Sequence, residues 1–372
     1  MTRHYLDHAS TSPLRPEVKA AMAASLDEPW GDPGRVHTEG MGVRARLEEA
    51  RETVAAFLGA RSREVVFCSG ATEAIAAATW GARERGPGDH VVAAAVEHSA
   101  VRAATESGPH TIVGVDRVGR VDPADVDAAI RDSTALVHIQ WGNHEVGTLQ
   151  PMAQIVEICR SRGVLVHVDA AAAAGRAPLD FDGLGADLMS ISGHKFGGPP
   201  GAGVLLVRRG LRLGPLLGGG DQERARRAGL ENVPAIAGLA AACGALAGER
   251  LGREAARARD LTDRIVDAVG DIDGVRSYGD TTGRLPHIVC FGIDDVEPQA
   301  VVLGLDRRGV AVHSGSACSS ESLEPSVVLE AMGVDAHRSL RVSAGWTTTD
   351  DDAYAFIDAF GAVLAELRAL RS

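Results

Sequence analysis

The chain has 372 residues, 45% of them hydrophobic and 24% charged, with a formal net charge of −12 and a pI near 5.5. This composition is typical of a globular protein with room for one large core and a second, smaller one. The negative charge disfavours a general electrostatic attraction to nucleic acid or to an anionic membrane, so we predict direct binding to neither.

The N-terminal stretch MTRHYLDHAS has no apolar signal-peptide core, and no apolar run approaches the roughly 20 residues of a membrane span. The five cysteines are scattered and odd in number, without the spacing of a zinc or redox motif. We therefore expect a reduced, cytoplasmic location. Four cysteines have apolar neighbours and are predicted to pack in the core, whereas Cys318 lies in the small-residue stretch VHSGSACSSES.

Apolar, strand-like runs alternate with helical segments through most of the chain. Strands that are apolar throughout and separated by helices indicate a largely parallel sheet covered on both faces. Beyond about Gly252 a long helical stretch and shorter strands indicate a smaller α+β unit. The strands expected in the larger unit cover residues 64–70, 89–96, 135–141, 164–170, 186–192 and 202–209.

The first of these strands ends in CSGATEA, where a helix is predicted to open near Thr72. Free amides at a helix N-terminus bind phosphate, and Thr72 adds a hydroxyl group. The next strand is followed by His98 in VEHSAV. Taken singly, a strand–Ser-Gly–helix turn is common and a histidine after a strand is more often structural than catalytic.

Two later strands also end in chemically useful residues. Asp169 ends VLVHVD, at the sheet edge where ligands of open α/β sheets gather, and could pair with a protonated pyridine nitrogen. Lys195 follows LMSIS in the turn GHK, ahead of a Gly/Pro loop that suits a Schiff-base amine. A lone GHK is more often an exposed turn, and a lone strand-end Asp is more often a cap. Together, however, the four signals supply every group needed to hold pyridoxal phosphate.

These segments resemble the class V aminotransferase fold and, within it, the NifS/IscS-like cysteine desulfurases. The matching stretches run from YLDHASTSP through EVVFCSGATEA, NHEVGTLQP, HVDAAAAAGR and SGHKFGGPPGAG to SGSACSSESLEPSVVLEAMG and LRVSAGWTTTDDD, so they cover essentially the whole chain. The form of SGSACSS is similar to that of the group with a long, mobile cysteine loop, which would cover about residues 313–337.

The resemblance implies an α/β chain of the pyridoxal-phosphate-dependent fold type I. Its large domain would hold a mostly parallel seven-stranded sheet flanked by helices, followed by a smaller α+β domain. We predict that residues 15–252 form the large domain, and that residues 1–14 and 253–372 form the small one. The family also implies a homodimer whose sites lie near the subunit boundary.

The resemblance further implies a role for each matching residue. Lys195 would form the Schiff base with the cofactor and later move the substrate α-proton, Asp169 would pair with the pyridine nitrogen, and His98 would stack on the ring and could assist proton transfer. Arg341 would hold the carboxylate of L-cysteine. Cys318 would take the sulfur as a persulfide, leaving alanine. The residues expected around the phosphate and its neighbourhood are Gly70, Ala71, Thr72, Ser192 and His194.

Four positions depart from the family pattern. Ala172 replaces the usual Gln three residues after the strand-end Asp, and His144 replaces the second Asn before Glu-x-Gly. We predict that His144 supplies a hydrogen bond that these two changes leave vacant. Leu230 replaces a Thr that reaches the phosphate of the neighbouring subunit, and Asp32 replaces an Asn close to the substrate end of the site.

The residues leave two other functions open. One is a pyridoxal-phosphate-dependent C–S lyase that acts on another sulfur-containing amino acid or cysteine conjugate without a protein persulfide. The other is a non-catalytic scaffold that binds sulfur-carrier partners. A desulfurase would pass its persulfide sulfur to an acceptor protein, whose pathway the sequence does not identify: iron–sulfur cluster assembly, tRNA thiolation, DNA phosphorothioation or metabolite thiolation.

Overall fold

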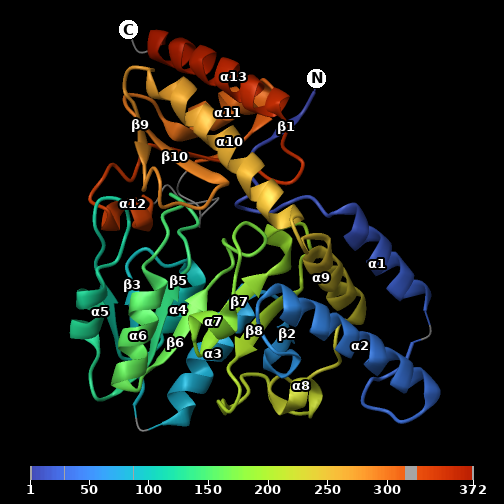
Figure 1. Ribbon diagram of the computed structural model, residues 1–372. Coiled ribbons are helices and arrows are strands. Elements are labelled where there is room, and N and C mark those ends of the chain that lie inside the picture. Colours follow the sequence, from blue (N-terminus) through green and yellow to red (C-terminus); the bar gives the residue numbers. More distant parts are fainter. Residues whose placement is uncertain (1, 29, 87, 315–324, 371–372) are drawn as a thin grey trace.

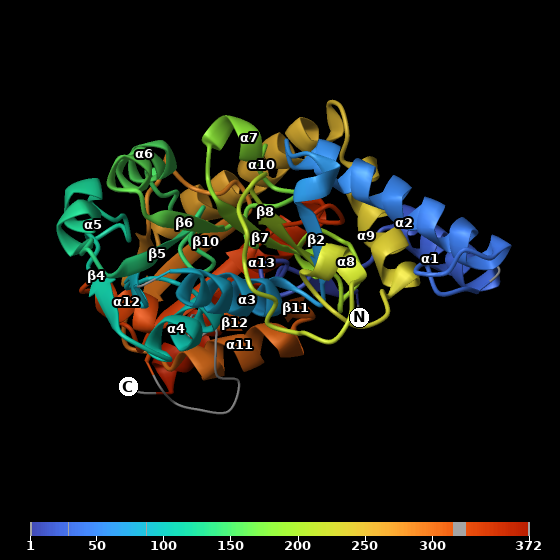
Figure 2. The ribbon, with the colours of Figure 1, turned by 90° about the horizontal axis from the view of Figure 1, so that it is seen from below.

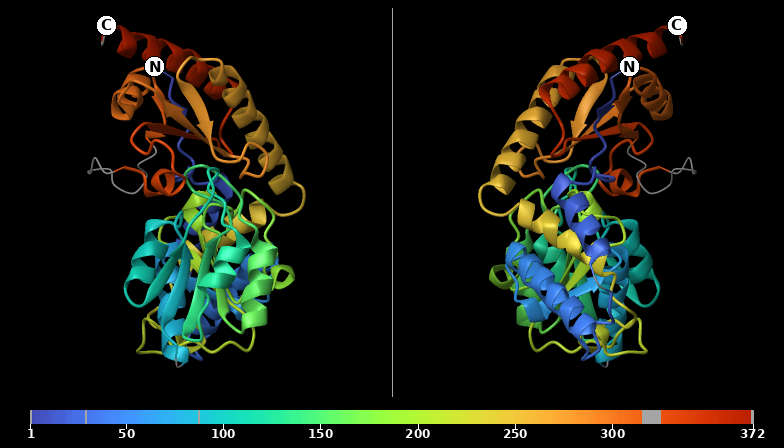
Figure 3. Two further views of the ribbon diagram at one scale, coloured as in Figure 1. Left: turned by 90° about the vertical axis from the view of Figure 1, so that its left-hand side faces the viewer. Right: turned by 90° about the vertical axis from the view of Figure 1, so that its right-hand side faces the viewer.

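The computed structural model describes residues 2–28, 30–86, 88–314 and 325–370. Two lobes lie one above the other, each built around its own sheet (Figures 1 and 3). The lower lobe in Figure 1 contains the larger sheet, and the upper lobe contains the C-terminal strands and helices together with the N-terminal strand.

The larger sheet has seven strands in the order β2-β8-β7-β6-β5-β3-β4. Every neighbouring pair from β7 to β4 is parallel, and only β8 runs against the others. The predicted seven-stranded, mostly parallel sheet is therefore confirmed. The strands are β2 (Val65–Cys68), β3 (His90–Ala94), β4 (His110–Val113), β5 (Thr134–Gln140), β6 (Leu165–Asp169), β7 (Leu188–Ser192) and β8 (Gly203–Val207).

Helices cover both faces of this sheet, which explains why its inner strands are apolar throughout (Figure 2). α3 (Ala71–Arg85) packs on one face against β5 to β8, and α4 (Ser99–Glu106) packs beside it against β3. α6 (Met152–Arg162) packs against β6 on the opposite face and ends at Gly163, which adopts the left-handed conformation that favours glycine. The remaining helical segments of this lobe are α1 (Pro16–Asp27), α2 (Thr38–Phe57), η1 (Ser62–Glu64), α5 (Pro123–Ala129), α7 (Phe181–Leu184), η2 (Gly193–Lys195), α8 (Gln222–Ala225) and α9 (Val233–Ala245).

The smaller sheet is antiparallel, in the order β12-β13-β10-β9, and has a separate apolar core. Its core packs beneath α10 (Arg250–Gly270), α11 (Pro298–Arg307) and α13 (Asp350–Ala369). α13 begins at a capping box in which Thr349 and Asp352 satisfy each other's backbone amides. The remaining elements are β9 (Val275–Tyr278), β10 (Ile288–Ile293), β11 (Val310–Ala311), β12 (His313–Ser314), α12 (Val327–Ala331) and β13 (Ser339–Ser343).

The N-terminal segment joins the two lobes. β1 (His4–Tyr5) pairs in parallel with β11 in the upper lobe, and the chain then runs down to α1 (Figure 1). α10 also leads from one lobe into the other. The predicted domain boundaries at residues 14/15 and 252/253 stay predictions. Among the helices of the described ranges, none is long and apolar enough to cross a membrane.

Candidate active site

A cavity of about 470 Å³ opens at the carboxyl-terminal edge of the large sheet. Strand ends of β5, β6 and β7 and the start of α3 form its wall, because parallel strands bring their carboxyl ends to one edge. All nine predicted cofactor-binding residues line this cavity: Gly70, Ala71, Thr72, His98, His144, Asp169, Ser192, His194 and Lys195.

One end of the cavity is formed by the start of α3. The first intrahelical hydrogen bond runs from Ala74 N to Gly70 O, so the amides of residues 71–73 have no acceptor within the helix. The helix has 15 residues, and its N-cap Gly70 makes no side-chain cap. A Cβ at Gly203 of β8 would lie only 2.5 Å from Gly70 Cα, so strand and helix start are in direct backbone contact. This end of the cavity suits an anion.

Asp169 lies at the end of β6 with one carboxylate oxygen already held. Its Oδ1 accepts hydrogen bonds from Ala171 N at 3.0 Å and from Ser190 Oγ at 3.2 Å. These bonds fix the rotamer of a buried carboxylate that faces the cavity. The arrangement suits a contact with a protonated nitrogen.

Three imidazoles line the cavity, and burial keeps them neutral. Burial lowers the pKa of His98 and of His144, and lowers the pKa of His194 to about 4 with help from the charge of Lys195. His98 Nδ1 accepts from Ala100 N at 3.1 Å, so its proton resides on Nε2. The His144 ring meets His98 edge-on, with centroids 5.1 Å apart, and its Nδ1 finds no hydrogen-bond partner among the described residues.

Lys195 ends the short turn η2 directly after β7. Its Nζ donates a hydrogen bond to Ala9 O at 2.5 Å, so the N-terminal segment contacts the side chain that the sequence marked as the Schiff-base amine. The amine and Asp169 thus come from adjacent parallel strands, β7 and β6, at the same cavity wall.

Arg341, predicted to hold the substrate carboxylate, lies on β13 and does not line the cavity. It is 3% exposed, and its Nη1 donates to His144 O at 3.0 Å. Its Nη2 donates to Asp7 Oδ1 at 3.0 Å and to Ser10 Oγ at 2.7 Å. The guanidinium therefore contacts His144 of the cavity wall, and both of its Nη atoms already donate hydrogen bonds.

Three further residues singled out in the sequence are not part of the cavity wall that the structure describes. Asp32 lies in a separate surface groove, beside Arg35, and Leu230 is 61% exposed, so in the single chain neither faces the cavity. Cys318 lies outside the described residues, as do residues 315–324 of the predicted cysteine loop. Of that loop, residues 313–314 form β12 and residues 327–331 form α12.

Two polar residues of the site were not predicted. Gln140 ends β5, lines the cavity and donates from Nε2 to Val96 O at 2.9 Å. Glu97 accepts from Gln140 N at 2.8 Å, and burial together with the charge of Asp169 raises its pKa well above the usual range. The rule that indicated Asp169 and Lys195, a polar residue at the end of an apolar strand, would also have found Gln140.

The other cysteines are poor nucleophiles. Burial raises the pKa of Cys68 and of Cys159 to about 12 and raises the pKa of Cys290 well above its ordinary value. A thiol attacks as its thiolate, so these buried groups are inert at neutral pH.

The fold and the cavity together define a class of protein. The family model for class-V aminotransferases matches residues 4–356, nearly the whole chain. The chain belongs to this family, whose members depend on pyridoxal phosphate.

Within the family its relatives are cysteine desulfurases. It is 40% identical to "Cysteine desulfurase IscS" of Dictyoglomus turgidum, over 98% of this chain and 95% of that protein. It is 38% identical to "Cysteine desulfurase IscS 1" of Archaeoglobus fulgidus, over 98% of each chain. Both the predicted family and the predicted NifS/IscS-like group are confirmed.

Solved structures agree with the sequence relatives. A NifS-like protein superposes with a TM-score of 0.92 at 29% identity, over 98% of this chain and all of that one. A structure described as SspA in complex with cysteine superposes with a TM-score of 0.80 at 28% identity, over 93% of this chain and all of that one. The type I fold predicted for the chain is thereby confirmed.

Proposed function

We propose that this protein is a cysteine desulfurase that uses pyridoxal phosphate to remove sulfur from L-cysteine. The products would be L-alanine and a persulfide on Cys318. The observation that carries the proposal is the gathering of all nine sequence-predicted cofactor residues around one cavity, in a chain whose full-length relatives are cysteine desulfurases.

The cavity fits pyridoxal phosphate at three separate points. The start of α3 offers unpaired amides to a phosphate, Asp169 offers a fixed carboxylate to a pyridinium nitrogen, and Lys195 offers an amine to an aldehyde. The unpartnered, buried Nδ1 of His144 offers a further hydrogen bond toward a polar group in the cavity. When bound, the cofactor supplies an electron sink for bond breaking next to the α-carbon of an amino acid.

The chain's own residues would then divide the remaining work. Lys195 Nζ would carry the substrate α-proton, and the neutral His98, with its proton on Nε2, could donate a hydrogen bond inside the cavity. Arg341 would receive the substrate carboxylate by exchanging one of its contacts to Asp7 or Ser10.

Sulfur transfer balances without an outside oxidant. The Cβ–S bond of cysteine breaks and an S–S bond to Cys318 forms, so one thiol and one cysteine give one persulfide and one alanine. The substrate sulfur and the Cys318 sulfur are each oxidised by one electron, and Cβ, which takes the electron pair of the C–S bond and a proton, is reduced by two. The outer sulfur of the persulfide would then pass to a nucleophile on an acceptor protein, and the Cys318 thiol would be the leaving group.

A homodimer is part of the proposal. Leu230 and Trp30 are 61% and 64% exposed, and each lies within two residues along the chain of a residue that lines the surface groove, Glu231 and Asp32 respectively. A second copy of the chain that covered these two side chains would remove their apolar surface from water. Such a contact would also place Leu230 near a neighbouring subunit, as the resemblance implies for the residue at its position.

The decisive experiment measures alanine and sulfide from L-cysteine, with dithiothreitol as the final acceptor. The wild-type protein loaded with pyridoxal phosphate is compared with Cys318→Ala and with the control Cys159→Ala, whose thiol is buried in α6. We expect Cys318→Ala to lose sulfide release at least about a hundredfold, because it lacks the nucleophile, and Cys159→Ala to keep it.

Full sulfide release by Cys318→Ala would contradict the persulfide route and favour a C–S lyase. Wild-type protein that gains no absorbance from pyridoxal phosphate would contradict the proposal altogether. Mass spectrometry of the cysteine-treated wild type, after alkylation, should find the additional sulfur on Cys318.

A further inference from the structure

The turn that carries Lys195 is held in place by hydrogen bonds to its main-chain carbonyl groups. Four consecutive carbonyls, those of residues 194–197, accept hydrogen bonds from residues 11–15 and from Arg176. Ser12 N donates to His194 O at 2.8 Å, and Arg15 N donates to Gly197 O at 3.0 Å. These contacts fix the main chain of the turn from which the Lys195 side chain extends.

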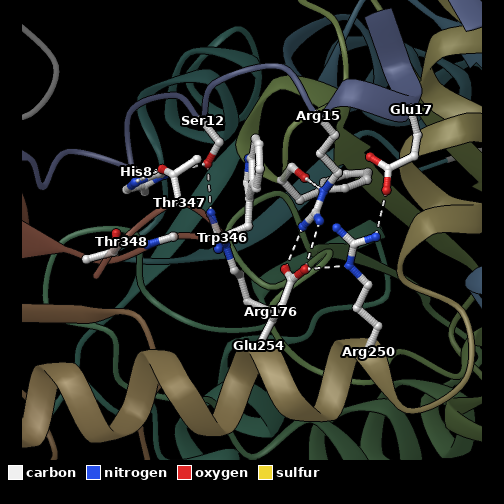
Figure 4. Close-up of polar contacts among 12 residues, drawn as sticks. His8, Ser12, Arg15, Glu17, Arg176, Arg250, Glu254, Trp346, Thr347 and Thr348 are labelled. Atoms are coloured by element: carbon white, nitrogen blue, oxygen red, sulfur yellow. Dashed lines mark hydrogen bonds and ion pairs between the residues drawn. The ribbon is translucent and has the colours of Figure 1, made fainter. Parts of the chain in front are cut away.

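The carbonyl of Lys195 itself receives two side-chain donors. Arg176 Nη2 lies 3.0 Å from Lys195 O, and Ser12 Oγ donates to the same oxygen at 3.0 Å. Arg176 Nη2 also donates to Ser12 Oγ at 2.8 Å (Figure 4). The guanidinium, the hydroxyl group and the Lys195 carbonyl therefore form a closed triangle of hydrogen bonds. The neutral ring of His8 approaches Ser12 Oγ through Nδ1 at 3.1 Å and completes its surroundings.

The burial of Arg176 is expected to lower the stability of the folded protein. It is buried, and no carboxylate of the described residues lies within ion-pair distance of its guanidinium. Burial and the charge of Arg15 lower its pKa to about 10, and its Nε has no hydrogen-bond partner in the part of the chain that the structure describes. An unpaired buried cation costs stability, whereas an apolar side chain would fill the space without that cost.

Arg176 also connects the two strand ends that matter for the cofactor. It closes the turn that follows Asp169, and its guanidinium reaches the turn that follows β7. Gly175, with φ of +70°, lies against Phe196, so the two turns pack directly on each other. Displacement of Arg176 would therefore change the spacing between Asp169 and Lys195.

A second arginine anchors the same turn to the other lobe. Arg15 Nε donates to Phe196 O at 2.9 Å, and its two Nη atoms hold Glu254 of α10 at 2.8 and 2.6 Å. Arg250 contributes to the same carboxylate at 3.0 Å (Figure 4). The lysine turn is thus fixed to the long helix that leads into the upper lobe.

We propose that Arg176, acting with Ser12 through the main-chain carbonyl of Lys195, is a positioning residue that sets where the Lys195 amine lies in the cavity. The inference rests on the proposed function, since it assigns Lys195 as the reactive amine. Arg176 itself touches the carbonyl, not the substrate or the cofactor.

The test compares four variants of the pyridoxal-phosphate-loaded protein: Arg176→Met, Arg176→Lys, Ser12→Ala and the control Arg284→Met. Arg284 is chosen because it is buried, has a pKa lowered by burial to about 10 and donates to the carbonyls of Leu285 and Ile288, away from the lysine turn; it differs from Arg176 in also pairing with Asp263. Each variant is measured for unfolding by urea, for kcat and KM with L-cysteine, and for the pH midpoint of the absorbance of the lysine-bound cofactor.

We expect Arg176→Met to lower kcat about a hundredfold, because misplacement of a reacting group by about 1 Å costs that much, while KM changes by less than about threefold. Its absorbance midpoint should move to higher pH. The buried positive charge of Arg176 disfavours protonation nearby, and the methionine variant lacks that charge. Arg176→Lys should recover most of kcat, and Ser12→Ala should lose about tenfold, the equivalent of one hydrogen bond. Arg284→Met should lose stability but keep kcat and the midpoint.

A folded Arg176→Met protein with wild-type kcat and midpoint would overturn the inference. The same changes in Arg284→Met would also overturn it, since they would then follow from lost stability. If Arg176→Met does not fold, Ser12→Ala decides, and unchanged values there overturn the inference. The absorbance midpoint needs no sulfur chemistry, so it tests the inference even if wild-type protein releases no sulfide.

Discussion

In the proposed function, Arg341 would bind the substrate carboxylate from a position where both of its Nη atoms already donate hydrogen bonds. A two-pronged contact to a carboxylate needs two neighbouring N–H groups, and the hydrogens of Nη2 go to Asp7 and Ser10. The Nε of Arg341 has no partner among the described residues. A substrate carboxylate would thus add to Nε and replace one contact of Nη2. The motif LRVSAG indicated Arg341 in the sequence. Its carboxylate partner, Asp7, lies 334 positions away along the chain and could not be predicted from that motif.

We predict that His144 supplies the hydrogen bond that Ala172 and the missing Asn leave vacant, and its buried Nδ1 has no partner among the described residues. We expect His144→Ala to shift the absorbance of bound pyridoxal phosphate and to weaken its binding by up to about tenfold, because one net hydrogen bond contributes about 1 kcal/mol. Spectra and equilibrium dialysis measure the two effects.

The control for His144 is His90→Asn. His90 is also buried, but it lies at the amino end of β3 and bonds to Thr111 and Thr134. An unchanged spectrum and affinity in His144→Ala would contradict the prediction that His144 supplies the hydrogen bond lost at Ala172 and at the missing Asn.

At the scale of elements, the strand ends were predictable and the sheet order was not. Apolar runs ending in Asp169 and Ser192 indicated parallel strands with a common edge, and β6 and β7 are indeed neighbours. The run that became β8 looked the same, yet it alone is antiparallel, between β2 and β7. Strand direction depends on the path of the connection, which local hydrophobicity does not encode.

Gly203 shows why that reversed strand matters to the cavity. We expect Gly203→Ala to push β8 away from the start of α3, because its Cβ would lie 2.5 Å from Gly70 Cα. The variant should lose about 1–3 kcal/mol of unfolding free energy and bind pyridoxal phosphate more weakly. Urea unfolding and cofactor titration measure the two changes.

Gly252→Ala provides the opposite control. Gly252 lies within α10 with open space around its Cβ position, so alanine there should stabilise the protein by about 0.5–1 kcal/mol. Equal behaviour of the two variants would contradict the role given to the contact between Gly203 and Gly70.

At the scale of the whole molecule, the lysine turn depends on contacts that the sequence did not reveal. Ser12 and Arg176 meet at the carbonyl of Lys195, and Arg15 pairs with Glu254, 239 positions away. Each residue alone reads as an ordinary polar side chain of a turn or helix. Only the folded arrangement of both lobes shows that they act on one turn.

Stability should depend on pH through buried histidines in both lobes. Burial lowers the pKa of His8 and of His167 to about 3, whereas an unfolded histidine binds its proton near pH 6.5. Between these values the unfolded chain holds more protons, so the free energy of unfolding falls as pH falls. The slope should reach roughly 1.4 kcal/mol per pH unit for each residue.

Glu145 should act in the opposite direction at higher pH. Burial raises its pKa to about 8, so the folded protein keeps a proton that the unfolded chain loses near pH 4.5. Stability is lost as pH rises through this window. Urea unfolding between pH 5 and 9 should therefore find a maximum inside the range, and His8→Asn should flatten the acid side. A slope unchanged in His8→Asn would contradict the assignment.

The position of residues 9–15 has a consequence for the order of folding. Ser12 lies 183 positions from Lys195, and Ala9 lies 334 positions from its partner Ser343. The large sheet can form from contacts closer along the chain, but the lysine turn receives its last hydrogen bonds only after the earliest and latest segments meet. Because such distant pairings form slowly, a refolding protein should regain its sheet before it regains the ability to bind cofactor through Lys195.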